Sequence, residues 1–310
     1  MLALLTACPG EPTIVPDKAS FNGVTQLDTV AGKAELSVSA LKDETVLTRG
    51  TITNASATVT STSLQAQQTF TVRAEVCGNI IPKGETITGL LTLDSTGSMG
   101  SNDPTKLRAV AAKDFVVRMS GQDRAAVASF DTSTAPTAPY TDLTIWQNFS
   151  SDKPLLETAI DKATFDRGDT NVWDAGIDSV ALLKTTSGEN KIVVLLTDGE
   201  YNRSSNDPED VIDSANQETT SIYTIGLGRS INARELLEIA SATGGTFNQV
   251  NEADDLIGLY DSIFNATRAS GCIEITFQPL PSPGAVLSGN LTFTVNGANL
   301  TTAYTVRFPD

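Results

Sequence analysis

Histidine is absent from this sequence of 310 residues, and cysteine, methionine and tryptophan are rare. The lack of histidine excludes the commonest general base of enzymes and the commonest zinc ligand. Basic residues are also few: there are 21 lysines and arginines against 37 aspartates and glutamates, and the formal net charge is −16. This excess of acid argues against binding to nucleic acid or to anionic lipid through the protein surface.

Long hydrophobic runs are equally scarce, and none approaches the roughly 20 apolar residues that span a bilayer. The first eight residues, MLALLTAC, resemble the end of a bacterial lipoprotein signal in which Cys8 becomes the acylated first residue. Because the basic start of such a signal is missing, we expect the true signal to begin upstream. Residues 9–28, rich in proline, glycine, threonine and aspartate, would then form a flexible tether. The alternative is a chance apolar N-terminus with a free cysteine.

The most informative stretch is LTLDSTGSMG, residues 91–100, in which an apolar strand is followed by a carboxylate and hydroxyls in a tight turn. A second apolar run, KIVVLLTDGE, ends in the same way, and a loop between the two runs supplies another hydroxyl. Oxygen atoms of this kind are the ligands that a hard cation such as Mg²⁺ prefers. The sequence therefore predicts a divalent cation site formed by Asp94, Thr96, Ser98, Thr170 and Asp198.

These segments resemble the metal-ion-dependent adhesion site of von Willebrand factor A (vWA) domains, and residues 87–270 resemble such a domain as a whole. The Asp-x-Ser-x-Ser motif of the family is matched from Asp94 to Ser98, with Thr96 in place of the usual first serine. That replacement keeps the hydroxyl and adds a methyl group. The resemblance implies bound Mg²⁺ or Mn²⁺, with Asp94 and Asp198 acting directly or through water.

The resemblance also implies a function. If hydroxyls contact the ion and the carboxylates hold its water ligands, the ion stays electrophilic, and a carboxylate of a partner protein can complete its coordination. We expect a protein ligand that presents one exposed aspartate or glutamate amid neutral or basic residues, because the acidic surface would repel an acidic partner. The predicted function is metal-dependent protein binding or adhesion on a bacterial cell surface. The alternative is a structural or assembly component of an envelope complex.

An enzyme is the remaining alternative. The run DSTGS resembles the aspartyl-phosphate motif of haloacid-dehalogenase-like phosphotransferases, in which the residue at Asp94 would be the nucleophile. However, Thr96 replaces the usual acidic residue, and no paired acidic residues follow Asp198. A phosphate-binding P-loop and the paired Asp-Thr/Ser-Gly units of an aspartic protease are absent. We therefore predict a protein that is not an enzyme.

The middle of the chain alternates between strand and helix patterns. Apolar residues recur at helical spacing in 104–119, after Asn102 and Asp103 as capping candidates. The alternation predicts an α/β fold with a doubly wound, mostly parallel sheet and a ligand site at the carboxyl ends of its strands. The other expected elements are strands at 125–130 and 221–227 and helices at 234–240 and 254–266.

Both flanks of this region show the period-two alternation of β-strands, rich in threonine and valine. We expect one small all-β module, a sandwich built from residues 29–86 and 271–310, with a hairpin turn at Asn296-Gly297. The serine and threonine content of residues 44–68 leaves an unfolded stalk as an alternative there.

Cys77 and Cys272 bracket the vWA-like region. The ends of a domain usually lie close together at its surface, and disulfides persist in exported proteins. We therefore predict a Cys77–Cys272 disulfide that joins the two ends of the domain.

Overall fold

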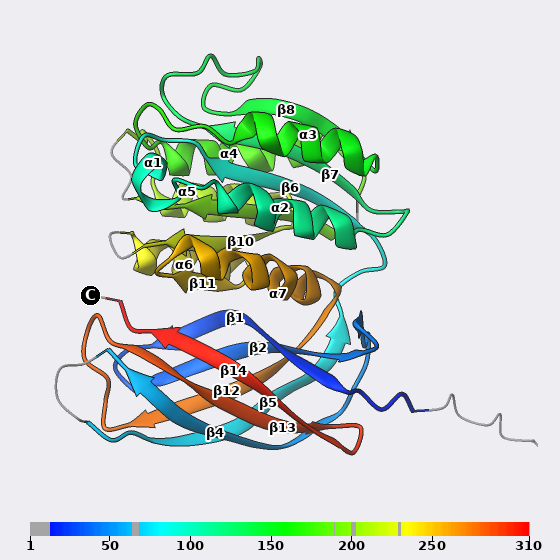
Figure 1. Ribbon diagram of the computed structural model, residues 1–310, viewed down its shortest axis with the longest axis vertical. Helices are drawn as coiled ribbons and strands as arrows, with labels where there is room; N and C mark the ends of the chain where they lie inside the picture. The colour runs from blue at the N-terminus through cyan, green and yellow to red at the C-terminus, as the bar shows by residue number, and fades with distance from the viewer. Residues whose placement is uncertain (1–12, 64–67, 189, 200–202, 229–230, 310) are drawn as a thin grey trace, which may run out of the picture.

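The protein consists of an α/β domain stacked on a β-sandwich (Figure 1). Its structure is a computed structural model, which describes residues 13–63, 68–188, 190–199, 203–228 and 231–309.

The α/β domain is built on parallel strands in the order β11-β10-β9-β6-β7, with β8 antiparallel at the outer edge. Strand β6 is buried at every position, as expected for a strand covered on both faces. The strands are β6 (Ile87–Asp94), β7 (Arg124–Phe130), β8 (Thr144–Ser150), β9 (Asn190–Thr197), β10 (Thr220–Leu227) and β11 (Phe247–Val250).

Helices cover both faces of this sheet. Helices α2, α3 and α7 pack on one face, around Phe115, Ile160 and Tyr260, and α4, α5 and α6 pack on the other, around Trp173. This is the doubly wound arrangement that the sequence predicts. The helices are α1 (Met99–Asn102), α2 (Leu107–Arg118), α3 (Lys153–Ala163), α4 (Val172–Lys184), α5 (Pro208–Gln217), α6 (Ala233–Thr243), the 3₁₀ turn η1 (Ala253–Asp255) and α7 (Leu256–Arg268).

The β-sandwich combines strands from both ends of the chain, as predicted. One layer has the order β5-β12-β2-β1, and the facing three-stranded sheet has the order β14-β13-β4. Burial alternates along β12, so one side of that strand faces the core. The strands are β1 (Lys18–Asp28), β2 (Lys33–Lys42), β3 (Thr45–Val46, paired with β2), β4 (Ile52–Thr62), β5 (Thr71–Pro82), β12 (Ala269–Gln278), β13 (Val286–Val295) and β14 (Ala298–Arg307).

The two parts share a sheet, which the sequence analysis did not anticipate. Strand β1 of the sandwich pairs with β11 of the α/β domain at Val24 and Phe247, so an 11-stranded sheet runs through both. Gly23 permits this close approach: its φ is +128°, and a Cβ there would lie 2.9 Å from the Phe247 carbonyl oxygen.

The predicted tether over residues 9–28 is wrong in its second half, because Lys18–Asp28 forms β1. Phe21 and Leu27 pack against the core and Val24 is buried in it, so this segment has apolar side chains to bury that a tether lacks. The stalk alternative is also wrong for residues 52–62, which form β4. The signal-like residues 1–8, with the lipidation site Cys8, lie outside the described residues. Within the described part of the chain, no helix has the length and apolar character of a membrane span.

Cys77 of β5 and Cys272 of β12 form a disulfide, with their Cα atoms 5.0 Å apart. Strand β5 leads into β6, and β12 follows α7 without an intervening residue. The disulfide therefore joins the strands through which the chain enters and leaves the α/β domain, as the sequence predicts.

Candidate metal site

The predicted metal-binding residues meet at the carboxyl ends of β6 and β9. These strands pair in parallel, with Leu93 beside Leu196, so Asp94 at the end of β6 and Asp198 just after β9 reach the same edge of the sheet. The loop before α4 brings Thr170 to this edge, because the backbone N–H of Gly97 donates to the carbonyl oxygen of Gly168 at 3.1 Å.

Asp94 is fully buried and hydrogen-bonded through both oxygens. Its Oδ1 accepts from the backbone N–H of Thr96 at 2.8 Å and from Thr96 Oγ1 at 2.6 Å. Its Oδ2 accepts from Thr197 Oγ1 at 2.7 Å and from the backbone N–H of Asp198 at 3.4 Å. One carboxylate thus links the turn after β6 to the turn after β9.

Ser98 continues this network to Asp198. Thr96 Oγ1 and Ser98 Oγ are 3.2 Å apart, and Ser98 Oγ donates to Asp198 Oδ1 at 2.6 Å. Asn102 of α1 donates through Nδ2 to Asp198 Oδ2 at 3.1 Å. The sequence analysis did not predict Thr197 and Asn102 as site residues. Asn102 was interpreted as a helix-capping candidate. Thr197 could have been predicted from its position directly before Asp198.

Thr170 is buried and faces the same point as Ser98. A Cβ placed on Gly199 would lie 3.7 Å from both Ser98 Oγ and Thr170 Oγ1. The two hydroxyls therefore converge on a space that the absence of a side chain at Gly199 leaves open.

Burial shapes the electrostatics of this cluster. It raises the pKa of Asp94 to about 6, with a further contribution from the negative charge of Asp198. Burial also raises the pKa of Asp198, against the hydrogen bonds from Ser98 and Asn102 that favour its charged form. Among the described residues, no lysine or arginine forms an ion pair with either carboxylate. The charge of Arg108 favours the ionised form of Asp198 without a direct ion pair, and a bound cation would offset the remaining negative charge.

The donor set suits a hard cation. It combines two carboxylates with neutral hydroxyls, the chemistry of an Mg²⁺ or Mn²⁺ site. In the described part of the chain, no group of three or more histidine, cysteine, aspartate or glutamate side chains forms an alternative metal cluster.

A buried ion-pair network around Arg108 lies next to the site. Arg108 of α2 is fully buried and pairs with Asp103 at 2.7 Å and with Asp166 at 2.8 Å. Asp103 also accepts from the backbone N–H groups of Leu107 at 2.6 Å and Arg108 at 3.1 Å, so it binds the first turn of α2, although Lys106 occupies the N-cap position. Arg108 therefore fixes α2 against the loop that leads to Thr170.

Comparison with known proteins establishes the family. The profile of the von Willebrand factor type A domain matches residues 90–262, more than half of the chain. The protein therefore belongs to the von Willebrand factor type A domain family, whose members are protein-interaction and adhesion modules that commonly bind a divalent metal and are typically not enzymes. A comparison with curated protein sequences gave no match.

Solved structures of a mussel byssus protein show the same fold. Proximal thread matrix protein 1 from the mussel byssus is 22% identical, with a TM-score of 0.51 over 69% of this chain and 50% of that chain. The form of that protein with a zinc-occupied MIDAS motif is 24% identical, with a TM-score of 0.51 over 65% and 49%. A von Willebrand factor type A protein from Catenulispora acidiphila is 14% identical, with a TM-score of 0.48 over 96% and 75%. The chain spans about half the length of the mussel structures.

Proposed function

We propose that this protein is a metal-dependent protein-binding module that holds Mg²⁺ or Mn²⁺ at the edge of its sheet. The observation that carries the proposal is the convergence of two buried carboxylates, Asp94 and Asp198, with the hydroxyls of the β6 turn and the α4 loop. The residues that would hold the ion are Asp94, Thr96, Ser98, Thr170 and Asp198.

Hydroxyl ligands determine what such a site can do. They are neutral, so they reduce the charge of the cation less than carboxylate ligands would. When bound, the ion would supply an electrophilic centre for a carboxylate from outside. Asn102 and Thr197 would position Asp198 and Asp94 through the hydrogen bonds described above.

The partner that fits is a protein with one exposed aspartate or glutamate in a neutral or basic setting. The net charge of −16 would repel a generally acidic surface, whereas a single carboxylate can still bind the ion. We further propose that the protein is exported and acts at a cell surface. The Cys77–Cys272 disulfide supports export, since disulfides persist in oxidising compartments. Lipid anchoring through Cys8 is part of this proposal.

A phosphotransferase is not supported by the geometry. The nucleophile would be Asp94, but this side chain is fully buried, and each of its oxygens accepts hydrogen bonds. An incoming phosphoryl group would have to displace these bonds.

A capture experiment tests the function. The purified protein should retain a partner from envelope extracts with Mg²⁺ and release it with chelator, and Thr170→Ala should abolish retention while circular dichroism stays unchanged. Asp213→Ala, which removes an exposed carboxylate on α5, is the matched control. A partner that is retained despite both chelator and Thr170→Ala would contradict the proposal.

A further inference from the structure

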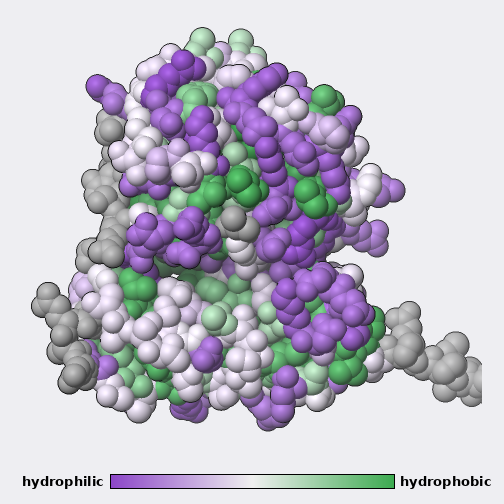
Figure 2. Space-filling model, in the orientation of Figure 1, coloured by the Kyte–Doolittle hydropathy of each residue, from purple (hydrophilic) through white to green (hydrophobic). Residues whose placement is uncertain are grey.

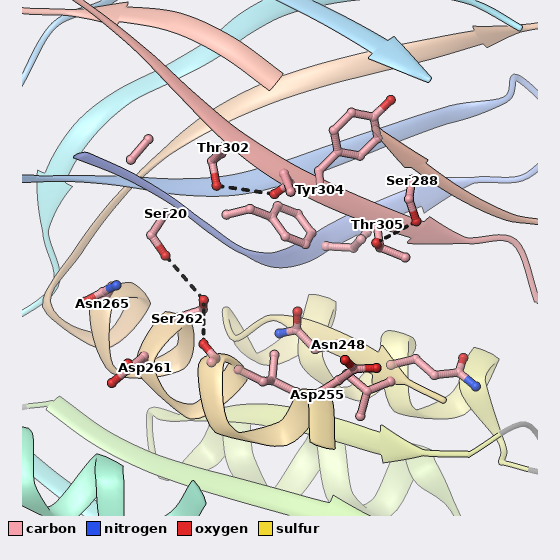
Figure 3. Close-up of a pocket in the computed structure, with 18 of the residues that line it drawn as sticks. Ser20, Asn248, Asp255, Asp261, Ser262, Asn265, Ser288, Thr302, Tyr304 and Thr305 are labelled. Carbon is pink, nitrogen blue, oxygen red and sulfur yellow. Dashed lines mark hydrogen bonds between the residues drawn. The ribbon is translucent and has the colours of Figure 1, made fainter. Parts of the chain in front are cut away.

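A cleft separates the sandwich from the α/β domain beside strand β11 and helix α7. It encloses about 690 Å³ and is lined by β1, β13 and β14 of the sandwich and by β11 and α7 of the α/β domain. The hollow between the two parts is visible in Figure 2, and Figure 3 shows the side chains along it.

Strand β14 brings an unpaired edge to this cleft. Among the described strands it pairs with β13 alone, in a register that continues from Val286–Arg307 to Val295–Ala298 without a shift. An edge strand of this kind presents free backbone donors and acceptors on its open side. The β14 residues that line the cleft are Thr302, Ala303, Tyr304, Thr305 and Arg307.

Hydrogen bonds at the end of the sheet show which of these residues point outward. The carbonyl oxygen of Val286 accepts from Ser63, on the β4 side, so the bonds to β14 come from its neighbour Leu287, which is paired with Val306. In an antiparallel pair these positions alternate. Val306, Tyr304 and Thr302 therefore bond to β13, whereas Ala303 and Thr305 direct their N–H and C=O groups away from it.

The side of the cleft opposite β14 suits an uncharged chain. Strand β1 contributes Phe21 and Val24, and the α/β domain contributes amide and hydroxyl side chains, among them Asn248 and Ser262. The charged lining residues largely pair with one another: Lys18 with Glu44 at 2.9 Å, and Arg118 with Asp261 at 3.1 Å. The cleft is therefore close to neutral in a strongly acidic protein.

We propose that this cleft is a second binding site, which accepts an extended peptide segment of a partner protein as an added strand on β14. The outward groups of Ala303 and Thr305 would pair with the peptide backbone, as in other cases of strand addition, and the peptide would share or displace the 3.3 Å bond that Thr302 Oγ1 donates to the Ala303 carbonyl oxygen. Alternate side chains of the peptide would face Phe21 and the amide-rich wall, so the segment should alternate apolar and polar residues and carry no net charge.

Panning a displayed library of random decapeptides against the full chain tests this proposal, with chelator present so that the metal site takes no part. We expect enrichment of uncharged, alternating sequences, whose synthetic peptides bind in fluorescence anisotropy. Ala303→Pro removes an outward N–H group without touching the bonds to β13, and it should weaken binding at least tenfold. Asn299→Pro removes an outward N–H group outside the cleft and should leave binding unchanged.

Amide hydrogen exchange gives a second readout that does not depend on variants. A bound peptide should slow exchange at Ala303 and Thr305, whereas Thr302 and Tyr304, already bonded to β13, should change little. Three outcomes would overturn the proposal: no peptide enriched over an unrelated protein, equal binding by Ala303→Pro and Asn299→Pro, or selective binding of uncharged oligosaccharides in place of peptides.

Discussion

Asp94 links the candidate site to the stability of the fold. Its pKa is about 6 in the folded chain against an ordinary 3.8, so the metal-free native state binds this proton more tightly than the unfolded state does. Below pH 4, protonated Asp94 therefore adds roughly 1 to 3 kcal/mol to the free energy of unfolding of the metal-free protein. This contribution is lost as the pH rises to about 6.

A divalent cation should remove this loss, because it favours the charged carboxylate. Urea unfolding between pH 4 and 7, in metal-free buffer and with saturating Mg²⁺, measures both curves. Asp94→Asn should flatten the metal-free curve. The same pH slope with and without Mg²⁺ would contradict the role of Asp94 at the site.

Thr96 stands where the family usually has serine, and it keeps the hydroxyl group. It is buried and donates to Asp94. Thr96→Ser should keep metal affinity within about threefold, whereas Thr96→Ala should lower it by about 10- to 100-fold, the range for groups that orient metal ligands. Calorimetric titration with Mn²⁺ compares the two variants. Equal affinity in both would show that the hydroxyl has no part in binding.

From the sequence, residues at fixed local spacing can be placed near one another, whereas residues brought in by packing cannot. Asp94, Thr96 and Ser98 lie in one turn, so their proximity is local. The role of Arg108 could not be predicted in this way, because a basic residue in a helix is usually solvated. The burial of Arg108 depends on its ion pair with Asp166, which is far along the chain.

At the scale of elements, the disulfide joins β5 to β12 across a sequence separation of 195. Removing the disulfide should increase the conformational entropy of the unfolded chain, because a long loop is then no longer closed. In a Cys8→Ser background, the double variant Cys77→Ala/Cys272→Ala should lose on the order of 3 to 5 kcal/mol in urea unfolding.

Thiol counting provides the control for that prediction. The air-oxidised Cys8→Ser protein should show no reactive thiol until it is reduced, and two reactive thiols in the folded protein would contradict the pairing.

The same strands bear on motion within the domain. The resemblance to von Willebrand factor A domains implies that the last helix, α7, shifts when a ligand engages the metal. Here α7 runs directly into β12, which the disulfide ties to β5. We expect the shift of α7 to be small while the disulfide is closed, and to grow on reduction. Spin labels on exposed positions of α2 and α7 can measure that distance with and without Mg²⁺ and partner, and an equally large shift in both redox states would refute the constraint.

Elements with strong periodicity could be predicted, and those defined by distant partners could not. Strands β6 and β9 are apolar runs that end in motif residues. Strand β1 has mixed composition, and it becomes a strand by pairing with β2 and packing Val24 in the core. Helix α3 was not predicted, although its start carries a sequence signal: Asp152 accepts from the backbone N–H of Leu155, and Pro154 follows in the first turn.

At the scale of the whole molecule, the shared sheet should make unfolding cooperative. The pairing of β1 with β11 and a core cluster that extends from Leu36 in the sandwich to Trp173 in the α/β domain join the two parts. Differential scanning calorimetry should therefore show one transition whose calorimetric and van't Hoff enthalpies agree. Two well-separated transitions would show that the parts unfold independently. No pattern in the sequence predicts this continuity, because Val24 and Phe247 are distant in the chain.

Binding of one divalent ion at the strand ends is the central claim, and isothermal titration of the metal-free protein with Mg²⁺ or Mn²⁺ tests it most directly. The wild-type protein and Asp213→Ala should bind one ion with the same affinity. Asp94→Ala and Asp198→Ala should lose that binding while circular dichroism stays unchanged. Unchanged metal affinity in both of these variants would contradict the assignment of the site.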